Sequence, residues 1–565
     1  MNPSRPVIWS IAGLDTAGGA GLSADQRAAD ALGVHLCPVA AALTAQHSQG
    51  VDAVMPVAEA QLQAQLQALA EDLPPRAIKT GLLGSVAAVR LVAQCVDHFR
   101  ARTPAGGDPH RQLALVVDPV LGASAGGQAF ADEAVRQAYR QWLLPRATVL
   151  TPNRAEARLL LGRSGGHDGP RDDLPALATE LRALGVRSVV ITGGDAPREV
   201  QGPDDQAWCL DWLDTLQAQG WLCAPRLHTP HHHGSGCTFA SGVAAAWALG
   251  HAETDAIVLA HMLTRHALAA GHAAGAGAGP VKALAGFATG PAQGGAPLPW
   301  LGLGQELPWR LSVPLDDTRR HAPQEGVLPP LFAPFTPPTD GLYGILPTHD
   351  LLHGALDSGL GCVQLRHKGL QGLEEQLDAS LAHAGQAGAQ LFINDHWRAA
   401  LALPPRMAVA PGFRLGVHLG QEDLQALSAE DRARLLAERD RIMLGLSSHS
   451  LWELARAVGC GASLIACGPV QATTTKDMPW QPQGEDNLRW WLAHSPVPVV
   501  AIGGLLTPAD VRRFAACGPA ALCVVRALGN DARAMQSAVP ALRSAVRVGR
   551  HEHRDAIVAL PHPVL

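Results

Sequence analysis

The stretch GSGCTFASG, residues 234–242, opens the last strongly helical segment in the first half of the chain. Its glycines Gly234 and Gly236 let the backbone turn so that free N–H groups and the positive end of the following helix face outward. This pattern predicts an anion hole for phosphoryl charge. Cys237 lies at the helix end, where a lowered thiol pKa would let it take a proton from a hydroxyl group. The alternative is a buried structural cysteine.

Outward from this stretch, short apolar runs alternate with amphipathic helical patterns from residue 7 to about 275. Runs such as VIWSIA (7–12) and LALVVDPV (113–120) are bounded by Gly or Pro and precede helical segments. Alternation of this kind indicates βαβ units around a mainly parallel sheet. The sequence therefore predicts one doubly wound α/β domain over residues 1–275.

Residues 276–336 are rich in Gly and Pro and keep neither strand nor helix period, so they predict a linker. Its Trp300, Trp309 and Phe332 are costly to expose, and part of it is expected to pack on a neighbour. The alternation resumes over 337–550 with eight strand candidates, the count of a (β/α)₈ TIM barrel. The tail 551–565 has no assignment.

The composition narrows the class of protein. Apolar residues make up 47% of the 565 residues, charged residues 17%, and the net charge is −6, which disfavours nucleic-acid or membrane-surface partners. The chain shows no leader pattern and no apolar run long enough to span a membrane, so we expect a cytoplasmic protein. Its ten cysteines contain no CxxC pair, so neither a zinc knuckle nor a disulfide framework is indicated.

Two further motifs in the first half carry polar residues beside apolar runs. Asp25 ends the glycine-rich loop that starts at Gly13, and with Gln46 it could present an acceptor and an amide to an aminopyrimidine edge. Asn153 and Glu156 in TPNRAEA suit a hydrated Mg²⁺ at the start of a helix. Ordinary helix capping explains each pair equally well.

With these motifs in view, residues 7–275 resemble the ribokinase-like superfamily, and within it the hydroxymethylpyrimidine and hydroxymethylpyrimidine phosphate kinases. The resemblance implies that Gly13, Asp25 and Gln46 contact the pyrimidine. It also implies that Asn153 and Glu156 organise Mg·ATP and that Cys237, in place of the Asp of sugar and pyridoxal kinases, is the base.

The first half departs from that family pattern at two positions. Ser124 and Thr192 stand where a basic residue and a Lys are frequent, which puts ATP affinity or one of the two phosphorylations in question. The run His231–His233 before the anion hole is open to two interpretations, a metal site or a solvated loop.

The second half carries polar residues at successive strand ends. Gln364, Arg366 and Lys368 alternate at the end of the second strand, a pattern that suits a pyrophosphate. Asp395 and Asp423 follow the next two strands and could bind Mg²⁺ against the same group. Later strand ends add further candidate ligand groups: Asn394, Ser447, Thr473, Thr475, Lys476, Gly504, Val525 and Arg526.

In their order, QLRHK, ND, HLGQED, GLSSHS, GPVQATTTK and AIGG resemble thiamine phosphate synthase over about residues 341–545. The resemblance implies a pyrimidine pyrophosphate site made by Gln364, Arg366, Lys368, Asn394, Ser447 and Lys476. It implies Mg²⁺ on Asp395 and Asp423, and a thiazole phosphate site lined by Thr473, Thr475, Gly504, Val525 and Arg526. Arg526 departs from the Ser usual in that family.

Together the two resemblances imply a bifunctional transferase of thiamine biosynthesis. ATP would phosphorylate an aminopyrimidine alcohol and then its monophosphate, and the pyrophosphate would condense with a thiazole phosphate. The alternatives are a vitamin kinase of other specificity, such as a pyridoxal kinase, joined to an aromatase-like barrel, and a domain reduced to ligand binding or regulation. Relatives of both kinds are usually oligomers, so a homo-oligomer is expected.

Overall fold

The computed structural model describes residues 5–102, 112–122, 130–163, 173–194, 200–201, 207–313, 331–402, 410–473 and 480–565. The chain divides into two compact units, Met1–Leu307 and Pro308–Val564. In the part of the chain just given, no helix is both long and apolar enough to cross a membrane.

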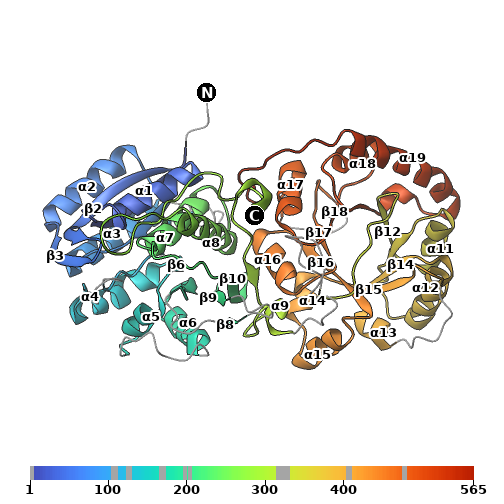
Figure 1. Cartoon of the computed structure of the whole chain (residues 1–565), viewed down its shortest axis with the longest axis horizontal. Helices are drawn as coiled ribbons and strands as arrows, with labels where there is room; N and C mark the ends of the chain where they lie inside the picture. The colour runs from blue at the N-terminus through green and yellow to red at the C-terminus, as the bar shows by residue number, and fades with distance from the viewer. Residues whose placement is uncertain are drawn as a thin grey trace. The chain divides into compact units, whose positions relative to one another are not determined.

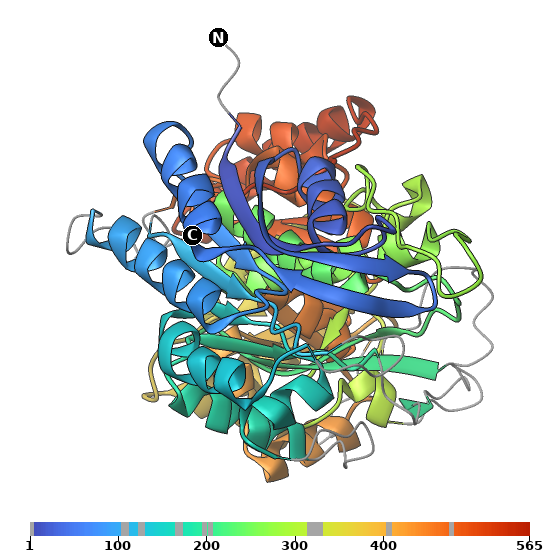
Figure 2. The ribbon, with the colours of Figure 1, turned by 90° about the vertical axis from the view of Figure 1, so that its left-hand side faces the viewer.

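The first unit is built on a sheet whose centre is parallel (Figure 1). Its strands are β1 (Val7–Leu14), β2 (His35–His47), β3 (Gly50–Pro56), β4 (Ala77–Thr80), β5 (Ala114–Val117), β6 (Val149–Leu150), β7 (Ser188–Ile191), β8 (Val200–Gln201), β9 (Ala207–Asp214), β10 (Gln219–Pro225) and β11 (Trp300–Leu301). They lie in the order β11-β10-β9-β7-β6-β5-β4-β1-β2-β3, with β8 paired to β9. From β2 to β7 the pairing is parallel, and antiparallel strands close both edges; the blue β2–β3 hairpin forms one of them (Figure 2).

Helices connect the strands of this sheet. They are α1 (Gly21–Leu32), α2 (Glu59–Asp72), α3 (Val86–Ala101), α4 (Glu133–Ala138), α5 (Arg154–Leu160), α6 (Leu174–Ala183), α7 (Ser235–Ala248) and α8 (Glu253–Ala269). Helix α7 packs between α1 and α8 and against β4 and β5. It is buried on every side from Thr238 to Ala248, which suits its near-continuous run of Ala, Val, Phe and Trp.

A buried ion pair lies between the central strand β4 and helix α1 of the first unit. Lys79 of β4 donates hydrogen bonds of 2.9 and 3.1 Å to the carboxylate of Asp25 on α1, and both side chains are fully buried. Asp118, just after β5, lies 3.4 Å from the Lys79 ammonium. Burial alone would lower the pKa of Lys79, but the nearby carboxylates raise it well above its usual value, so the ammonium stays charged.

The first part of the segment expected to be a linker belongs to the first unit. Residues up to Leu307 belong to that unit, and β11 pairs antiparallel with β10. The Trp300 ring packs on Trp208 with centroids 4.4 Å apart. Burial of these large rings explains why a Gly- and Pro-rich segment without period still packs on its neighbour.

The second unit is a closed parallel barrel surrounded by helices (Figure 1). Its strands are β12 (Leu342–Leu346), β13 (Cys362–Leu365), β14 (Gln390–Asn394), β15 (Arg414–Leu419), β16 (Ile442–Ser448), β17 (Leu464–Cys467), β18 (Val499–Ile502) and β19 (Ala521–Val524). Its helices are α9 (Trp309–Ser312), α11 (His349–Asp357), α12 (Leu373–Ala387), α13 (Trp397–Ala402), α14 (Gln421–Gln425), α15 (Ala429–Ala437), α16 (Leu451–Gly459), α17 (Gly484–His494), α18 (Pro508–Ala515) and α19 (Ala532–His551). The predicted (β/α)₈ barrel and its eight strands are confirmed.

The barrel interior is filled by side chains from successive strands and from the segment before β12. Phe335 packs on Phe392 with ring centroids 6.1 Å apart, inside a cluster that also contains Tyr343. Ser463 holds this segment by donating to the Ala333 carbonyl oxygen at 2.7 Å. Trp309 and Phe332, predicted to need cover, are buried in this unit.

The tail beyond α19 is anchored on α17. The amide of Asn487 donates to the His562 carbonyl oxygen at 3.1 Å and accepts from the His562 N–H at 2.9 Å. The backbone N–H of Gln481 donates to the Val564 carbonyl oxygen at 2.7 Å. The unassigned tail is therefore part of the packing around the later helices of the barrel.

We expect Lys79→Met to destabilise the first unit by about 3–5 kcal/mol, because it leaves the carboxylates of Asp25 and Asp118 buried without their cation. Calorimetry of the full chain checks this through the unfolding transition of the first unit. Lys282→Met, at an exposed lysine, is the matched control. Equal transitions for the two variants would contradict a structural role for the ion pair.

Candidate functional site

The first cavity lies at the carboxyl edge of the parallel strands and has a volume of about 190 Å³. Residues that directly follow β1, β4, β5, β6 and β7 line it, together with the beginning of α7. Since the strand order runs from β1 to β2 on one side and from β1 to β4 on the other, the cavity lies at the point where an open α/β sheet binds ligands.

The structure brings most of the predicted first-half residues to this cavity. Those that line it are Gly13, Gln46, Asn153, Glu156, Gly234, Gly236 and Cys237, and the departing residue Thr192 joins them. Ser124, the other departure, lies outside the described residues.

The beginning of α7 has the geometry of an anion hole. Gly234 precedes the helix with φ +85°, and a Cβ there would collide with the Gly19 carbonyl oxygen, so only glycine fits. No side chain caps the helix at Gly234. The N–H groups of the first turn, including those of Gly236 and Cys237, can therefore bind an anion that enters the cavity.

Cys237 lies at the cavity, but its thiol is not activated as we predicted from its helix position. Burial raises the pKa of Cys237, and the carboxylates of Asp118 and Asp25 raise it further against the opposing effect of Lys79. The expectation of a lowered pKa is thus wrong for the ligand-free chain, because desolvation and two acidic neighbours outweigh the helix terminus and the lysine.

Asp25 is separated from the cavity that it was predicted to line. Its carboxylate is fully buried and accepts hydrogen bonds from Ser10 at 2.6 Å and Ser241 at 2.8 Å, besides those from Lys79. Asp25 is absent from the cavity lining. The structure therefore places it as the anchor of the buried lysine, beneath the site.

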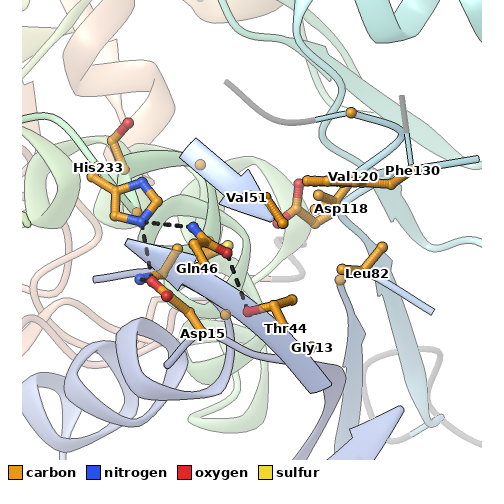
Figure 3. Close-up of a pocket in the computed structure, with 18 of the residues that line it drawn as sticks. Gly13, Asp15, Thr44, Gln46, Val51, Leu82, Asp118, Val120, Phe130 and His233 are labelled. Carbon is orange, nitrogen blue, oxygen red and sulfur yellow. Dashed lines mark hydrogen bonds and ion pairs between the residues drawn. The ribbon is translucent and has the colours of Figure 1, made fainter. Parts of the chain in front are cut away.

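Asp15 occupies the cavity position that the sequence analysis gave to Asp25 (Figure 3). It accepts from the backbone N–H groups of Gly19 and Ala20 at 2.9 and 2.8 Å, and it lies 3.1 Å from Nε2 of His233. Burial would raise the pKa of Asp15, but these hydrogen bonds hold it below its usual value. Gln46 meets the same imidazole nitrogen at 3.3 Å.

The histidine run is thereby partly explained. His233 joins Asp15 and Gln46 at the cavity, and its backbone pairs with the segment at Pro280. Within the described ranges, His231–His233 do not take part in a cluster of three metal-ligating groups.

Asn153 and Glu156 form a complete capping box at the start of α5. The Asn153 side chain accepts from the Glu156 N–H, and the Glu156 carboxylate accepts from the Asn153 N–H, both at 2.9 Å. Thr192 pairs with Asn153 through the backbone of the next strand end. Both residues therefore cap the helix, as the alternative interpretation predicted, and both also line the cavity.

The second cavity, of about 750 Å³, lies at the carboxyl ends of the barrel strands. Nearly all the predicted second-half residues line it: Gln364, Arg366, Lys368, Asn394, Asp395, Asp423, Ser447, Thr473, Gly504, Val525 and Arg526. Thr475 and Lys476 lie outside the described residues.

A chain of hydrogen bonds runs from the barrel core to the rim of this cavity. The Tyr343 hydroxyl donates to Oε1 of the Gln364 side chain at 2.8 Å, and Nε2 of Gln364 donates to Oδ1 of Asn394 at 3.0 Å. The Asn394 amide donates to Asp395. Burial raises the pKa of Tyr343 well above its usual value, so its hydroxyl remains a donor. The chain fixes which amide atom of Gln364 faces Asn394.

Asp395 and Asp423, the predicted Mg²⁺ ligands, both line the second cavity. Asp395 has φ 63°, the only positive φ among the described non-glycine residues, and such conformations concentrate at functional sites. Asp423 accepts the Gly420 N–H at 3.0 Å. Each carboxylate thus has one oxygen oriented by a neighbour, and Arg366 and Lys368 line the same cavity.

Several residues that the sequence analysis did not select also line the second cavity. Ser447 lies 2.9 Å from Nε2 of His418, and burial lowers the pKa of His418 to about 4, with Arg366 and His449 contributing. His449 pairs with Glu453 at 2.9 Å and stacks parallel to Trp480. His418 lies in the motif HLGQED and His449 in the motif GLSSHS, near the ends of β15 and β16. Their position near a strand end could have identified them as cavity residues from the sequence.

The two sites define a chain with a phosphate-handling α/β domain and a phosphate-handling barrel. The family model described as phosphomethylpyrimidine kinase matches residues 15–282, and the model described as thiamine monophosphate synthase matches residues 342–528. The first match covers every residue that lines the first cavity except Gly13, and the second covers every residue that lines the second cavity.

Known proteins resemble the whole chain or its first half. The chain is 29% identical to a chloroplastic thiamine biosynthetic bifunctional enzyme of Arabidopsis thaliana, over 88% of this chain and 85% of that protein. It is 38% identical to a hydroxymethylpyrimidine/phosphomethylpyrimidine kinase of Synechococcus elongatus, over 48% of this chain and 95% of that kinase. It is 29% identical to a solved pyridoxal kinase of Bacillus subtilis, with a TM-score of 0.43, over 50% of this chain and 98% of that one.

The chain belongs to the hydroxymethylpyrimidine/phosphomethylpyrimidine kinase family, and it joins that kinase domain to a thiamine phosphate synthase domain. It is a bifunctional transferase of thiamine biosynthesis, as the sequence analysis predicted. The predicted doubly wound α/β architecture of the first domain is confirmed with it. The alternative of a pyridoxal kinase joined to an aromatase-like barrel does not agree with the two family matches.

We predict that Tyr343→Phe lowers synthase activity by roughly tenfold, because the buried Gln364 amide loses its donor and no longer orients Asn394 and Asp395. Steady-state assay of the synthase step measures the loss. Tyr139→Phe is a matched control, since the chain's only other tyrosine lies in the first unit and should leave this step unchanged. A Tyr343→Phe enzyme with full synthase activity would disprove the orienting chain.

Proposed function

We propose that the cavity of the first unit performs both phosphorylations of the aminopyrimidine, with ATP as phosphoryl donor. Gly13, Gln46, Asp15 and His233 would hold the pyrimidine ring. These residues lie together near the end of β1, and they offer a carboxylate acceptor, an amide and an imidazole to the polar edge of the pyrimidine. Asp25 would support these residues indirectly, because its buried ion pair with Lys79 ties α1 to β4 beside the cavity.

The phosphoryl group would lie at the beginning of α7. Its N–H groups face the position where charge develops on the transferred group, and dipoles held in place before the reaction need no reorganisation. The substrate hydroxyl oxygen attacks the γ-phosphorus, the bond from phosphorus to the leaving ADP oxygen breaks, and Cys237 accepts the hydroxyl proton. Because the pKa of Cys237 is raised in the ligand-free chain, the proton transfer becomes easier at higher pH.

The acidic residues of each cavity would hold Mg²⁺. In the first unit Glu156 and Asp118 line the cavity near the start of α5 and the end of β5. In the second, Asp395 and Asp423 each have one oriented carboxylate oxygen, a donor set that suits an ion which prefers a few carboxylates and several waters. Bound there, Mg²⁺ would neutralise phosphate charge.

The second cavity would bind the pyrimidine pyrophosphate and the thiazole phosphate together. Arg366 and Lys368 face the pyrophosphate and stabilise the charge that it gains as the methylene–oxygen bond breaks. The resulting pyrimidine methylene cation is then captured by the thiazole nitrogen, which forms the new carbon–nitrogen bond. Gly504 lies just after β18, and Val525 and Arg526 lie just after β19, where such barrels bind phosphate.

The observation that carries this proposal is that each cavity collects the predicted residues from separate strand ends. Thr475 and Lys476 belong to the proposal by resemblance alone. We further propose that the protein is cytoplasmic and a homo-oligomer, with small-molecule partners.

A coupled assay tests the division of labour. Purified full chain receives pyrimidine alcohol, ATP, Mg²⁺ and thiazole phosphate, and thiamine phosphate is measured. We expect Cys237→Ala to abolish product from the alcohol but not from pyrimidine pyrophosphate, and Asp395→Ala to abolish both. Full synthase activity in the Asp395 variant would refute the metal assignment, and product from the alcohol in the Cys237 variant would refute the base.

The pH dependence of the kinase step tests the thiol more sharply. Because a raised pKa keeps Cys237 protonated near neutral pH, we expect kcat of the kinase to rise between about pH 7 and pH 9, where the thiolate fraction grows. Cys237→Asp supplies a carboxylate that is largely ionised across this range, so its profile should be flatter. Parallel profiles for the two enzymes would exclude the thiol as the titrating base.

A further inference from the structure

Three histidines converge on the outer face of the barrel, away from the two cavities already described. His349 and His353 lie one turn apart on α11, so they share one face of that helix. His383 reaches them from α12, which packs on α11. One ring nitrogen from each histidine lies within 4.8 Å of the others, the only such three-residue group among the described residues. None of the three lines either cavity.

The distances within the group match a metal site. Nε2 of His349 lies 3.0 Å from Nδ1 of His383, and two imidazole nitrogens bound tetrahedrally at about 2.0–2.1 Å from a Zn²⁺ ion lie about 3.3 Å apart. The rings of His353 and His383 are stacked with centroids 3.7 Å apart. One of these rings must rotate away from the stack before the nitrogens of all three histidines can point at one ion.

Neighbouring acceptors orient two of the imidazoles. Nδ1 of His349 lies 3.3 Å from the Asp350 carboxylate, and Nε2 of His353 lies 3.4 Å from the Asp357 carboxylate. A carboxylate beside one ring nitrogen is the usual outer arrangement of metal-binding histidines, because it orients the ring. Nε2 of His349 faces Nδ1 of His383, which also lies 3.2 Å from the Ala379 carbonyl oxygen.

Solvent access completes the site. The side chain of His349 is 17% exposed and that of His353 is 41% exposed. An ion held by the three nitrogens would keep a fourth position for water. Imidazole ligands favour Zn²⁺, Co²⁺, Ni²⁺ or Cu²⁺, whereas Mg²⁺ prefers oxygen. This group is therefore different in kind from the carboxylates of the substrate cavity.

We propose that His349, His353 and His383 bind one divalent transition-metal ion of the Zn²⁺ class, which clamps α11 to α12. Helix α11 begins just after Leu346 and Pro347, which line the substrate cavity, and α12 follows the strand end that carries Arg366 and Lys368. The ion would thus stabilise the two helices that support the pyrophosphate side of the barrel. The site is independent of the Mg²⁺ proposed at Asp395 and Asp423.

Equilibrium binding of Zn²⁺ to the metal-free full chain, measured against a chelating indicator, tests the site. Because the chain has 25 histidines, the informative quantity is the difference between variants. We expect His383→Gln, and separately the pair His349→Gln with His353→Gln, to remove one equivalent of tight binding, weakening it by roughly 100-fold or more. His551→Gln, at an exposed histidine of α19, should keep it.

Two further measurements separate metal binding from a folding defect. The variants should keep the synthase activity measured with Mg²⁺, and Co²⁺ bound to the unaltered chain should show the visible absorption of a tetrahedral nitrogen site that is absent from the His383→Gln variant. Equal Zn²⁺ stoichiometry and affinity in all four proteins would overturn the proposal, and the histidines would then be only a stacked and hydrogen-bonded surface group.

Discussion

Parallel strand pairing is the constraint on which both units depend. A parallel strand must be followed by a crossover that returns the chain to the opposite edge, so the carboxyl ends of neighbouring strands meet on one side of the sheet. In the first unit this edge gathers the residues after β1, β4, β5, β6 and β7 around one cavity. In the second unit closure of the barrel gathers the ends of its strands around another. Residues far apart in the sequence form one site because the parallel strands all end on the same side of the sheet or barrel.

Each cavity rests on a buried polar group that ties site geometry to stability. Under the first cavity, the Lys79 ammonium joins Asp25 on α1 to Asp118 at the end of β5, and it lies near Cys237. Under the second, Tyr343 begins the hydrogen-bond chain that ends at Asp395. Buried donors and acceptors are costly when unpaired, so such networks hold one arrangement of the side chains above them.

Much of the fold followed from sequence pattern. The eight barrel strands and the parallel sheet were predicted because apolar runs with helical segments between them have few alternative packings. The strand-end residues of the barrel were predicted as a group for the same reason. The segment 276–307 was not recognised as part of the first unit, because its contribution to the sheet is the short β11, whose pairing with β10 depends on contacts between distant residues.

The individual chemistry of the residues was less predictable. The motif around Gly234 determined a helix that begins with free N–H groups, and the alternation of Gln364, Arg366 and Lys368 determined a polar rim. Only the tertiary structure showed that Asp15 lines the cavity while Asp25 is buried on Lys79, and that Cys237 has a raised pKa. Sequence spacing specifies the face of a helix or strand on which a side chain lies. The burial of that side chain and the charged groups around it, which decide its pKa, come from elements that meet only after folding.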